Sequence, residues 1–568
     1  MQGAGTLALQ NFKAPAITGK APMDSRDIAG EILKRQAQME ADRANWETLW
    51  QTIAGFVAPQ VNFTNKQPEG YRQGLDIFDS TPELASDRCS AAINSLLTPK
   101  SQMWSMLKPV NSDLWEVDEV KRHAEDVNGI LFAKRYRPHS NFASQIHEVY
   151  KSLTDFGTGA LFSEEIPGDG LIYRSCALNG LYITQDLYGR VVYLHYKFEM
   201  TAEQAAQRFG VENLPPQVSV KLADRPDDKA TYIHCVKPNP SPIWGARGPM
   251  GMAYESWWVC KDARQVVGKG GFRTFPYAVS RYVMRSGETY GRSPAMMALA
   301  DTTMLNEMGR TIIQEAQLSI SPPLLVHNDG VLSTLGDGVS LLPAAINYGG
   351  VSAEGRPLIQ ALNRGSAWAP VKDEIKDRRQ SVNAAFLVTL FQILVDTPQM
   401  TATEAMLRAQ EKGALLAPVA ERQESELLGP IIERELDLLG RSGALPPPPE
   451  VLLEEGGYKL EYDNPMRQAM LASQGVGLVR TIEAMTPLAT IDPTVMDVFN
   501  PDEIGPGLAE INGVPMKWMR TKDELAAIRE NRKQQTNVDQ LIAAAPQVTG
   551  AIKNIADIQQ QAQAPVGF

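Results

Sequence analysis

The chain has 568 residues, of which 43% are hydrophobic, and this is too long for one ordinary domain. Its formal net charge of -11 argues against a protein that grips nucleic acid along its phosphates, because such binding needs clustered lysine and arginine. No apolar run reaches the roughly 20 residues that a helix needs to span a bilayer, so we expect no stable membrane insertion.

The first part of the chain reads as helical. Residues 1–25 resemble a flexible arm that lacks a secretory pattern. An amphipathic helix follows from about Asp27, and its tryptophans Trp46 and Trp50 are expected in a core. Further helices are expected over 82–97, 114–136 and 142–156.

From residue 160 to residue 284 the pattern changes to short β-branched and aromatic runs bounded by Gly, Pro and Asp. These runs predict a mostly antiparallel sheet. A short helix capped by Thr201 interrupts them. The first half is therefore expected to be an α+β body, with strands at 160–162, 171–173, 191–196 and 255–259.

Two long helices then enclose a turn-rich, β-prone segment. The first is capped by Ser293, spans 294–320 and is stopped by Pro322-Pro323, which lack backbone donors. The second spans 370–390. Because a small projecting module buries too little apolar surface to be stable alone, the hairpin suggests packing against copies of itself. On the first helix, apolar residues recur at i+3 and i+4, as is typical of an amphipathic helix; they are Met297, Ala300, Met304, Met308, Ile312 and Ala316.

The remaining chain is mainly helical. A long helix over 402–439 is expected to bend or break at Pro418 and Pro430, and a proline-rich linker follows. Helices are expected over 467–485 and 522–535, and a short heptad seam begins at Val538.

No motif predicts catalysis or a cofactor. The four cysteines contain no CxxC pair, and we expect reduced, buried thiols. The six histidines lack metal-ligand spacing, and no Gly-x-Ser-x-Gly elbow occurs. The segment 268–271 (Gly-Lys-Gly-Gly) lacks the spacing of a phosphate-binding loop, and we expect a tight turn. Asp79-Ser80-Thr81 is read as a helix cap, with the Ser80 or Thr81 hydroxyl as acceptor.

A basic cluster on the second hairpin helix allows two interpretations. One is a solvated face paired with acids such as Asp373 and Asp377. The other is a ring of positive charge lining a channel, and neutralising arginines would then alter DNA packaging or retention more than assembly. The cluster consists of Lys372, Lys376, Arg378 and Arg379.

Many short pieces occur in an order that resembles a known family. They include Tyr290-Gly291-Arg292-Ser293-Pro294, Leu305-Asn306, Ser321-Pro322-Pro323-Leu324-Leu325-Val326, and Met400-Thr401-Ala402-Thr403-Glu404. Earlier pieces are Phe78-Asp79-Ser80-Thr81 and Ser95-Leu96-Leu97-Thr98-Pro99, and a later one runs from Tyr458 to Pro465. This order resembles the head-to-tail connecting (portal) proteins of short-tailed bacteriophages, over roughly residues 27–533.

The resemblance implies a ring of twelve subunits at one capsid vertex. Its parts would be an arm (1–25), an α+β wing (26–293), a stem helix (294–320), a β-containing clip (321–369), a second stem helix (370–390), a channel loop (391–401), a long wing helix with linker (402–457), a helical crown (458–535) and a C-terminal barrel-type helix with tail (536–568).

The resemblance also implies sites and partners. Double-stranded DNA would pass near the basic cluster and near Gln392, Asp396, Thr397 and Gln399. The clip would bind partners through Leu324, Leu325, Val326, Leu341, Leu342 and Tyr348. Partners would be terminase, tail adaptor and tail proteins, major capsid and scaffolding proteins, and internal core or ejection proteins at the crown. Assembly would occur in the host cell cytoplasm. The alternative is a monomeric or small-oligomer helical scaffold of the virion, and an enzyme ranks third.

Overall fold

The structure is a computed structural model in which two compact units can be distinguished. The larger comprises Asn11–Trp104 and Leu131–Ala444, and the smaller comprises Met1–Gln10, Ser105–Ile130 and Leu445–Phe568. The structure describes residues 25–326 except 65–66, 69, 72–73, 112–113, 116, 167–169, 244–250 and 321–323, and then residues 354–356, 359–361, 368–388, 417–454, 457–462, 478, 480–487, 498–511, 518–520 and 524–532.

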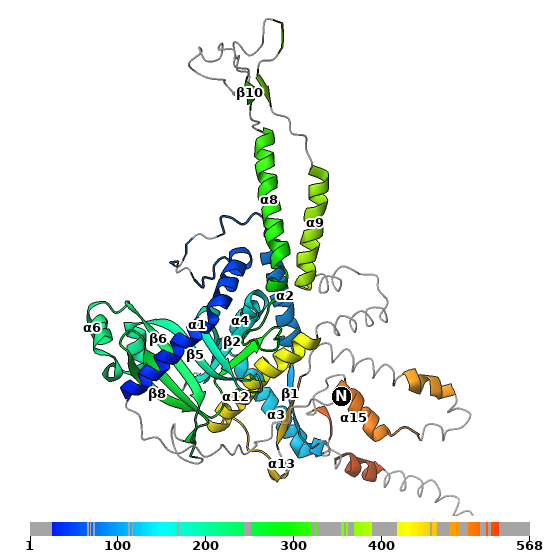
Figure 1. Cartoon of the computed structure of the whole chain (residues 1–568). Coiled ribbons are helices and arrows are strands. Elements are labelled where there is room, and N and C mark those ends of the chain that lie inside the picture. Colours follow the sequence, from blue (N-terminus) through cyan, green and yellow to red (C-terminus); the bar gives the residue numbers. More distant parts are fainter. Residues whose placement is uncertain are drawn as a thin grey trace, which may run out of the picture. The chain divides into compact units, whose positions relative to one another are not determined.

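An antiparallel five-stranded sheet forms the main body of the larger unit (Figure 1). Its strand order is β4-β5-β6-β7-β8, so each strand pairs with its neighbour in sequence. The strands are β4 (Leu181–Gln185), β5 (Val191–Thr201), β6 (Lys229–Pro238), β7 (Tyr254–Cys260) and β8 (Gln265–Phe272).

Helices cover both faces of this sheet. Adjacent residues of a strand point to opposite faces, so one strand contributes side chains to the contacts on both sides. On one face, Trp258 packs with residues of α5 (Ala202–Phe209) and α6 (Pro216–Asp224). On the other, Trp257 packs with Ala29 and Ile32 of α1 (Ser25–Val57). The alternation within one strand thus builds two separate cores.

A three-stranded antiparallel sheet, ordered β3-β2-β9, completes the body. It contains β2 (Thr158–Ile166), β3 (Gly170–Cys176) and β9 (Tyr277–Arg281). Helix α4 (Phe142–Phe156) packs against β2 and β3 as well as against α2 (Thr81–Leu97). The end of α4 is set by Gly157, which adopts a left-handed conformation that favours glycine.

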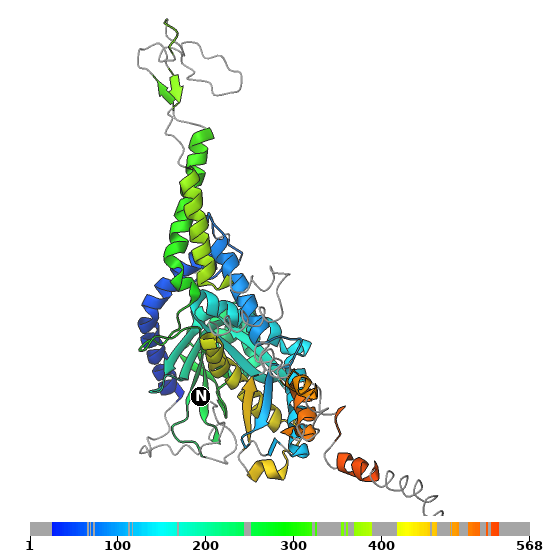
Figure 2. The ribbon, with the colours of Figure 1, turned by 90° about the vertical axis from the view of Figure 1, so that its right-hand side faces the viewer.

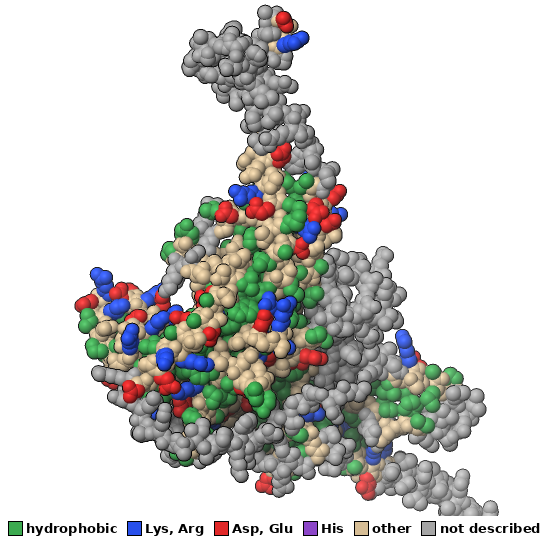
Figure 3. Space-filling view, viewed as in Figure 1, with side chains coloured by type: hydrophobic (Ala, Val, Ile, Leu, Met, Phe, Trp, Pro, Cys, Tyr) green, Lys and Arg blue, Asp and Glu red, His purple; other side chains and the backbone are tan. Residues whose placement is uncertain are grey.

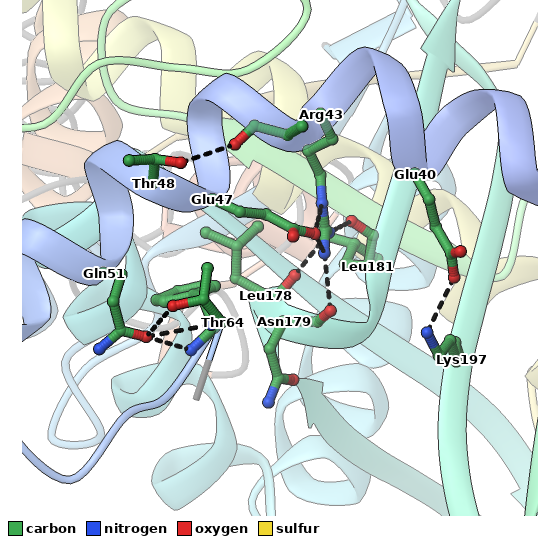
Figure 4. Close-up of polar contacts among 12 residues, drawn as sticks. Glu40, Arg43, Glu47, Thr48, Gln51, Thr64, Leu178, Asn179, Leu181 and Lys197 are labelled. Carbon is green, nitrogen blue, oxygen red and sulfur yellow. Dashed lines mark hydrogen bonds and ion pairs between the residues drawn. The ribbon is translucent and has the colours of Figure 1, made fainter. Parts of the chain in front are cut away.

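Arg43 ties α1 to the sheet (Figure 4). Its guanidinium donates to the carbonyl oxygens of Leu178 at 3.0 Å, Asn179 at 2.7 Å and Leu181 at 2.6 Å. It also bonds Glu47 one helical turn on. The buried charge is thereby fully hydrogen-bonded, which is the condition under which burial is tolerated.

The hairpin follows β9. A first turn, α7 (Pro294–Met297), leads into α8 (Leu299–Ile320), and α9 (Trp368–Ala385) returns beside it in both views (Figures 1 and 2). Between them β10 (Leu324–Val326) pairs antiparallel with β11 (Ile359–Ala361).

The chain returns to the body through a continuous helical segment that includes a π-helix (Glu424–Leu428) and α12 (Gly429–Arg441). Pro430 lacks an N–H and clashes with the carbonyl four residues earlier, and the widened π turn just before it accommodates this residue. Glu426 of the π-helix accepts from the Arg281 guanidinium at 2.8 Å, which fixes the segment on β9.

The smaller unit contains a two-stranded antiparallel sheet. Here β1 (Ser105–Pro109) pairs with β12 (Tyr458–Tyr462). His123 bonds the Tyr458 hydroxyl and the Pro446 carbonyl. The short helix α13 (Glu450–Glu454) contributes Leu452 to a core with Leu114 and Val120. Helix α15 (Pro501–Ile511) lies further along the chain, and α3 (Asp118–Arg135) begins in this unit.

The α+β class, the antiparallel sheet and the Thr201 cap are confirmed. All four cysteines are free and buried, as expected. Several details were wrong. The segment 268–271 lies within strand β8 and forms no turn. The second hairpin helix stops at Ala385 instead of residue 390, because Leu387 adopts a left-handed conformation. Helix α3 starts at Asp118 instead of residue 114, and α15 was not expected.

The expected arm, the channel loop over 391–401 and the heptad seam after Val538 lie outside the described residues. The compact units also divide the chain differently from the expected wing, because Ser105–Ile130 groups with the C-terminal part.

Candidate functional site

The base of the hairpin is built on two backbones that cross without side chains between them. A Cβ atom on Gly157 would lie 2.3 Å from the Gly291 carbonyl oxygen, and one on Gly291 would lie 2.2 Å from the Gly157 oxygen. The Thr158 hydroxyl accepts from the Gly291 N–H at 2.9 Å. Only glycine permits this approach at both positions.

Ser293 caps the first turn of the hairpin and joins it to the body. Its hydroxyl accepts from the Met296 N–H at 3.1 Å and donates to the Asp155 carbonyl at 2.9 Å. The predicted Ser293 cap is therefore confirmed.

The Asp155 carboxylate is buried just before this crossing. It accepts a hydrogen bond from Ser86 and pairs with Lys151 at 3.5 Å. Burial raises the pKa of Asp155 to about 6, although Lys151 and Ser86 favour its charged form.

Asn306 anchors the middle of α8 to the segment that precedes α2. Its side-chain oxygen accepts from the Phe78 N–H at 2.7 Å, and its amide donates to the Asp76 carbonyl at 2.9 Å. One turn further along, Gly309 leaves room for Phe78, whose Cβ would lie 3.2 Å from an added Cβ. These contacts fix the position of α8 along its axis relative to the body.

Two arginines of α9 make ion pairs within the chain. Arg378 contacts Asp301 of α8 at 2.8 Å and Glu374 at 2.8 Å, and these hydrogen bonds raise its pKa. Arg379 donates to Asp79 at 2.8 and 3.0 Å. The arginines of these three pairs are partly exposed, and the pairs are thus expected to position the helices more than to stabilise them.

Asp79 also caps α2, but differently from the expectation. Its carboxylate accepts from the Thr81 N–H at 2.8 Å, while Ser80 makes no side-chain cap bond. Burial raises its pKa, yet the hydrogen bonds from Thr81 and Arg379 outweigh burial and hold the pKa below the ordinary value.

The apolar residues of the hairpin divide into a buried set and an exposed set. Leu305 of α8 is buried, as are Ile375, Val382 and Phe386 near α9. In contrast Met297 is 62% exposed and Met304 is 43% exposed, and Ala300 is also exposed. The first half of this apolar stripe therefore faces solvent. In Figure 3, hydrophobic and charged side chains share the visible hairpin surface.

The remaining predicted site residues are distributed as follows. Lys372 and Lys376 are exposed on α9. The backbones of Leu324, Leu325 and Val326 form β10. Residues Leu341, Leu342, Tyr348, Gln392, Asp396, Thr397 and Gln399 lie outside the described residues.

The anchoring role of Asn306 and Gly309 was missed. Both are poor helix formers in the interior of a helix, and that was the available signal. Their partners, Phe78 and Asp76, are distant in sequence and follow no local pattern.

Histidines in the sheet are satisfied core residues. His234 contacts the Tyr277 and Ser256 hydroxyls, and burial lowers its pKa well below the ordinary value. His195 bonds Gln36, and burial lowers its pKa to about 3. Within the described ranges, no three His, Cys, Asp or Glu side chains are grouped as a metal site would require. No helix in that part of the chain has the length and apolarity to cross a bilayer.

These features define an α+β body that holds a tied helical hairpin with a β pair between its helices. Comparison with known proteins agrees. The model of the family described as bacteriophage head to tail connecting protein matches residues 29–519. The chain belongs to this family, and the predicted resemblance is confirmed.

Two curated relatives cover nearly the whole chain. The "Probable portal protein" of Bordetella phage BPP-1 is 27% identical over 525 residues, which is 90% of this chain and 92% of that protein. The "Portal protein" of Salmonella phage epsilon15 is 26% identical over 541 residues, with 93% and 95% covered.

Solved structures with weaker similarity come from gene transfer agent particles. A chain of "Neck of empty GTA particle computed with C6 symmetry" has a TM-score of 0.33 and 12% identity, covering 74% of this chain and 89% of that chain. A chain of "Virion of native gene transfer agent (GTA) particle" has a TM-score of 0.35 and 12% identity, with 77% and 89% covered.

Proposed function

We propose that this head-tail connector is the subunit of a portal ring of about twelve copies at one capsid vertex of a phage. Family membership over residues 29–519 and two relatives named as portal proteins support this proposal. The ring surrounds an axial channel through which double-stranded DNA is packaged and later ejected. The protein is then a structural part of the virion, and we assign it no reaction and no cofactor.

The charge of the chain suits passage of DNA. Twelve copies of a chain with a net charge of -11 make a strongly negative ring. Such a ring repels phosphates, so that a duplex slides without being gripped, and a few basic side chains supply weak, reversible contacts.

The basic cluster is the candidate for those contacts, but its members differ. Lys372 and Lys376 are exposed on α9 and are the better candidates for DNA. Arg378 and Arg379 pair with Asp301 and Asp79, so part of their effect in a variant would come from a displaced helix.

The clip between α8 and α9 is proposed to engage terminase during packaging and the tail adaptor and tail proteins afterwards. The body would contact major capsid and scaffolding proteins during assembly in the host cytoplasm. Residues 458–535 would face internal core or ejection proteins.

The exposed methionines of α7 and α8 are the structural observation that supports the ring. Met297 is the last residue of α7, and Met304 lies on α8, which is already packed on α9 and the body through residues such as Leu305. Apolar surface on a projecting hairpin is stabilised when it is covered. In a ring, the neighbouring copy supplies that cover through a head-to-tail interface.

Native mass spectrometry with negative-stain imaging tests the proposal on the full chain. We expect a closed ring of about twelve subunits with a central hole. The double variant Met297→Asp/Met304→Asp is expected to stay folded and to lose the ring, since charge on this face opposes its burial. Val220→Asp is the matched control, because Val220 is 61% exposed on α6 of the body.

A ring that assembles equally well from the double variant would contradict the assigned interface. A wild-type monomer that also stays out of procapsids formed with shell and scaffolding proteins would contradict the portal proposal and favour a scaffold.

A further inference from the structure

The ion pair between Arg378 and Asp301 fixes how the two helices of the hairpin are aligned. It joins α9 to the start of α8 at 2.8 Å. From this pair both helices continue away from the body, α8 toward higher residue numbers and α9 toward lower ones (Figure 2). Glu307 and Lys372 each lie six residues further out. Since a helix rises about 1.5 Å per residue, both lie about 9 Å beyond the pair along the hairpin.

Glu307 and Lys372 project from opposite sides of the hairpin. Successive helical residues are turned by about 100°, so a step of six residues leaves a side chain turned by about 120°. Both helices are right-handed and antiparallel, and this turn therefore has the same sense in both when it is viewed along the hairpin. Asp301 and Arg378 point at each other. The two outer residues consequently point away from each other, and both are exposed.

These two charges have little compensation within the chain. Glu307 pairs with Arg310 at 3.9 Å, which is the outer limit of an ion pair, and both side chains are more than half exposed. The ion pairs of α9 belong to Arg378 and Arg379, so Lys372 has none with any residue that the structure describes. A carboxylate on one side and an ammonium on the other are complementary between two copies of the hairpin.

This arrangement favours a head-to-tail contact. Such an interface joins two different surfaces, and repeating it by rotation closes a ring. When the hairpins run along the ring axis, the rotation brings together residues that lie equally far along the hairpin. Met304 is exposed one turn before Glu307 on α8, so apolar and charged contacts would adjoin.

We propose that Glu307 of each copy pairs with Lys372 of the next copy. This contact rests on the proposed ring and names the two sides that meet in it. It assigns Lys372 to the interface and leaves Lys376 as the candidate for a DNA contact. One exposed pair is weak, but it repeats at every interface, and like charges placed there would oppose closure of the ring.

Charge reversal tests the contact by native mass spectrometry and negative-stain imaging of the full chain. We expect Glu307→Lys and Lys372→Glu each to reduce the fraction of chains in rings about tenfold or more, and the combined variant to restore it to within about twofold of the wild type. Glu307→Lys with Lys376→Glu is the matched control and should not restore rings. Rings from both single variants, or equal rescue by Lys376→Glu, would overturn the proposal.

An equimolar mixture of the two single variants tests whether the pair joins different chains. We expect rings from the mixture, because alternating copies then place opposite charges at every interface. Thermal unfolding near that of the wild type shows that each variant is folded. If only the combined variant formed rings and the mixture did not, the pair would lie within one chain and the proposal would be wrong.

Two outcomes separate this contact from the proposed function. A wild-type chain that forms no ring, alone or in procapsids, contradicts the proposed function and the contact with it. Intact rings from Lys372→Glu that fail to retain DNA would leave the ring in place and show that Lys372 faces the channel, which overturns the contact alone.

Discussion

The sheet body and the hairpin are stabilised in different ways. The body buries aromatic side chains on both faces of its sheet, and the buried Arg43 guanidinium is fully hydrogen-bonded. The hairpin buries fewer apolar side chains. Partly exposed ion pairs and the hydrogen bonds of Asn306 hold its helices in position. Its outer methionines remain exposed.

This difference suggests a division of labour. The body is held by contacts within the chain, whereas we propose that the hairpin gains further contacts from neighbouring copies. Changes in the body should therefore reduce stability, and changes on the outer hairpin face should reduce assembly while stability stays near that of the wild type.

The largest effect is expected at a buried ion pair of the body. Arg135 and Glu435 are 1% and 0% exposed and form two hydrogen bonds, and Tyr173 also donates to Glu435. Glu435→Gln leaves the arginine charge buried without a counter-charge, and we expect a loss of about 3–5 kcal/mol in the free energy of unfolding. Thermal and urea unfolding measure it.

Glu307→Gln is the control for this prediction, because Glu307 pairs with Arg310 on the exposed hairpin surface and should change stability far less. Equal effects of the two substitutions would mean that the body and the hairpin do not differ as described.

The glycine crossing at the hairpin base is expected to be the next most sensitive point. Gly157→Ala combines a left-handed backbone with a clash against Gly291, and we expect a loss of about 3 kcal/mol or more. Gly170→Ala has a similar backbone conformation with open space around it, so only about 1–2 kcal/mol should be lost. Matching midpoints of unfolding for the two variants would rule out the steric role of the crossing.

A smaller, pH-dependent effect is expected from Asp155. Its pKa in the folded protein is about 6, above the roughly 3.9 of an unfolded chain, so the folded state binds more protons between these values. Stability from this group is present below about pH 4 and is lost as the pH rises through about 6. The loss amounts to at most about 3 kcal/mol.

Asp155→Asn removes this titration, and its stability relative to the wild type should therefore rise between pH 4 and pH 7. Asp87→Asn controls for a change of charge near Lys151, since Asp87 is largely exposed. A stability difference between Asp155→Asn and the wild type that is constant over this range would show that the group does not titrate there.

Helices, strands and caps were predicted from the sequence more accurately than the contacts between them. Local patterns located the strands of the body, the Thr201 and Ser293 caps and the start of the hairpin. The inward face of α8 could not be predicted because apolar residues recur on two of its sides, and the periodicity does not tell which side meets the body. The choice is made by Asn306 and Gly309, whose partners near Phe78 are distant in sequence.

The pairing between strands that are far apart in sequence could not be predicted either. Strand β1 pairs with β12 although more than half of the chain separates them, and neither segment carries a turn signal that points to the other. The end of α9 depends on the backbone conformation of a single leucine, Leu387, for which helix propensity predicts the opposite.

Cryo-electron microscopy of the assembled particle tests the central claim most directly, because it shows which surfaces meet between copies. The account predicts that Met297 and Met304 are buried against a neighbouring subunit, with the Arg378–Asp301 pair intact inside each hairpin. A ring held only by its sheet bodies, with both methionines exposed to solvent, would contradict it.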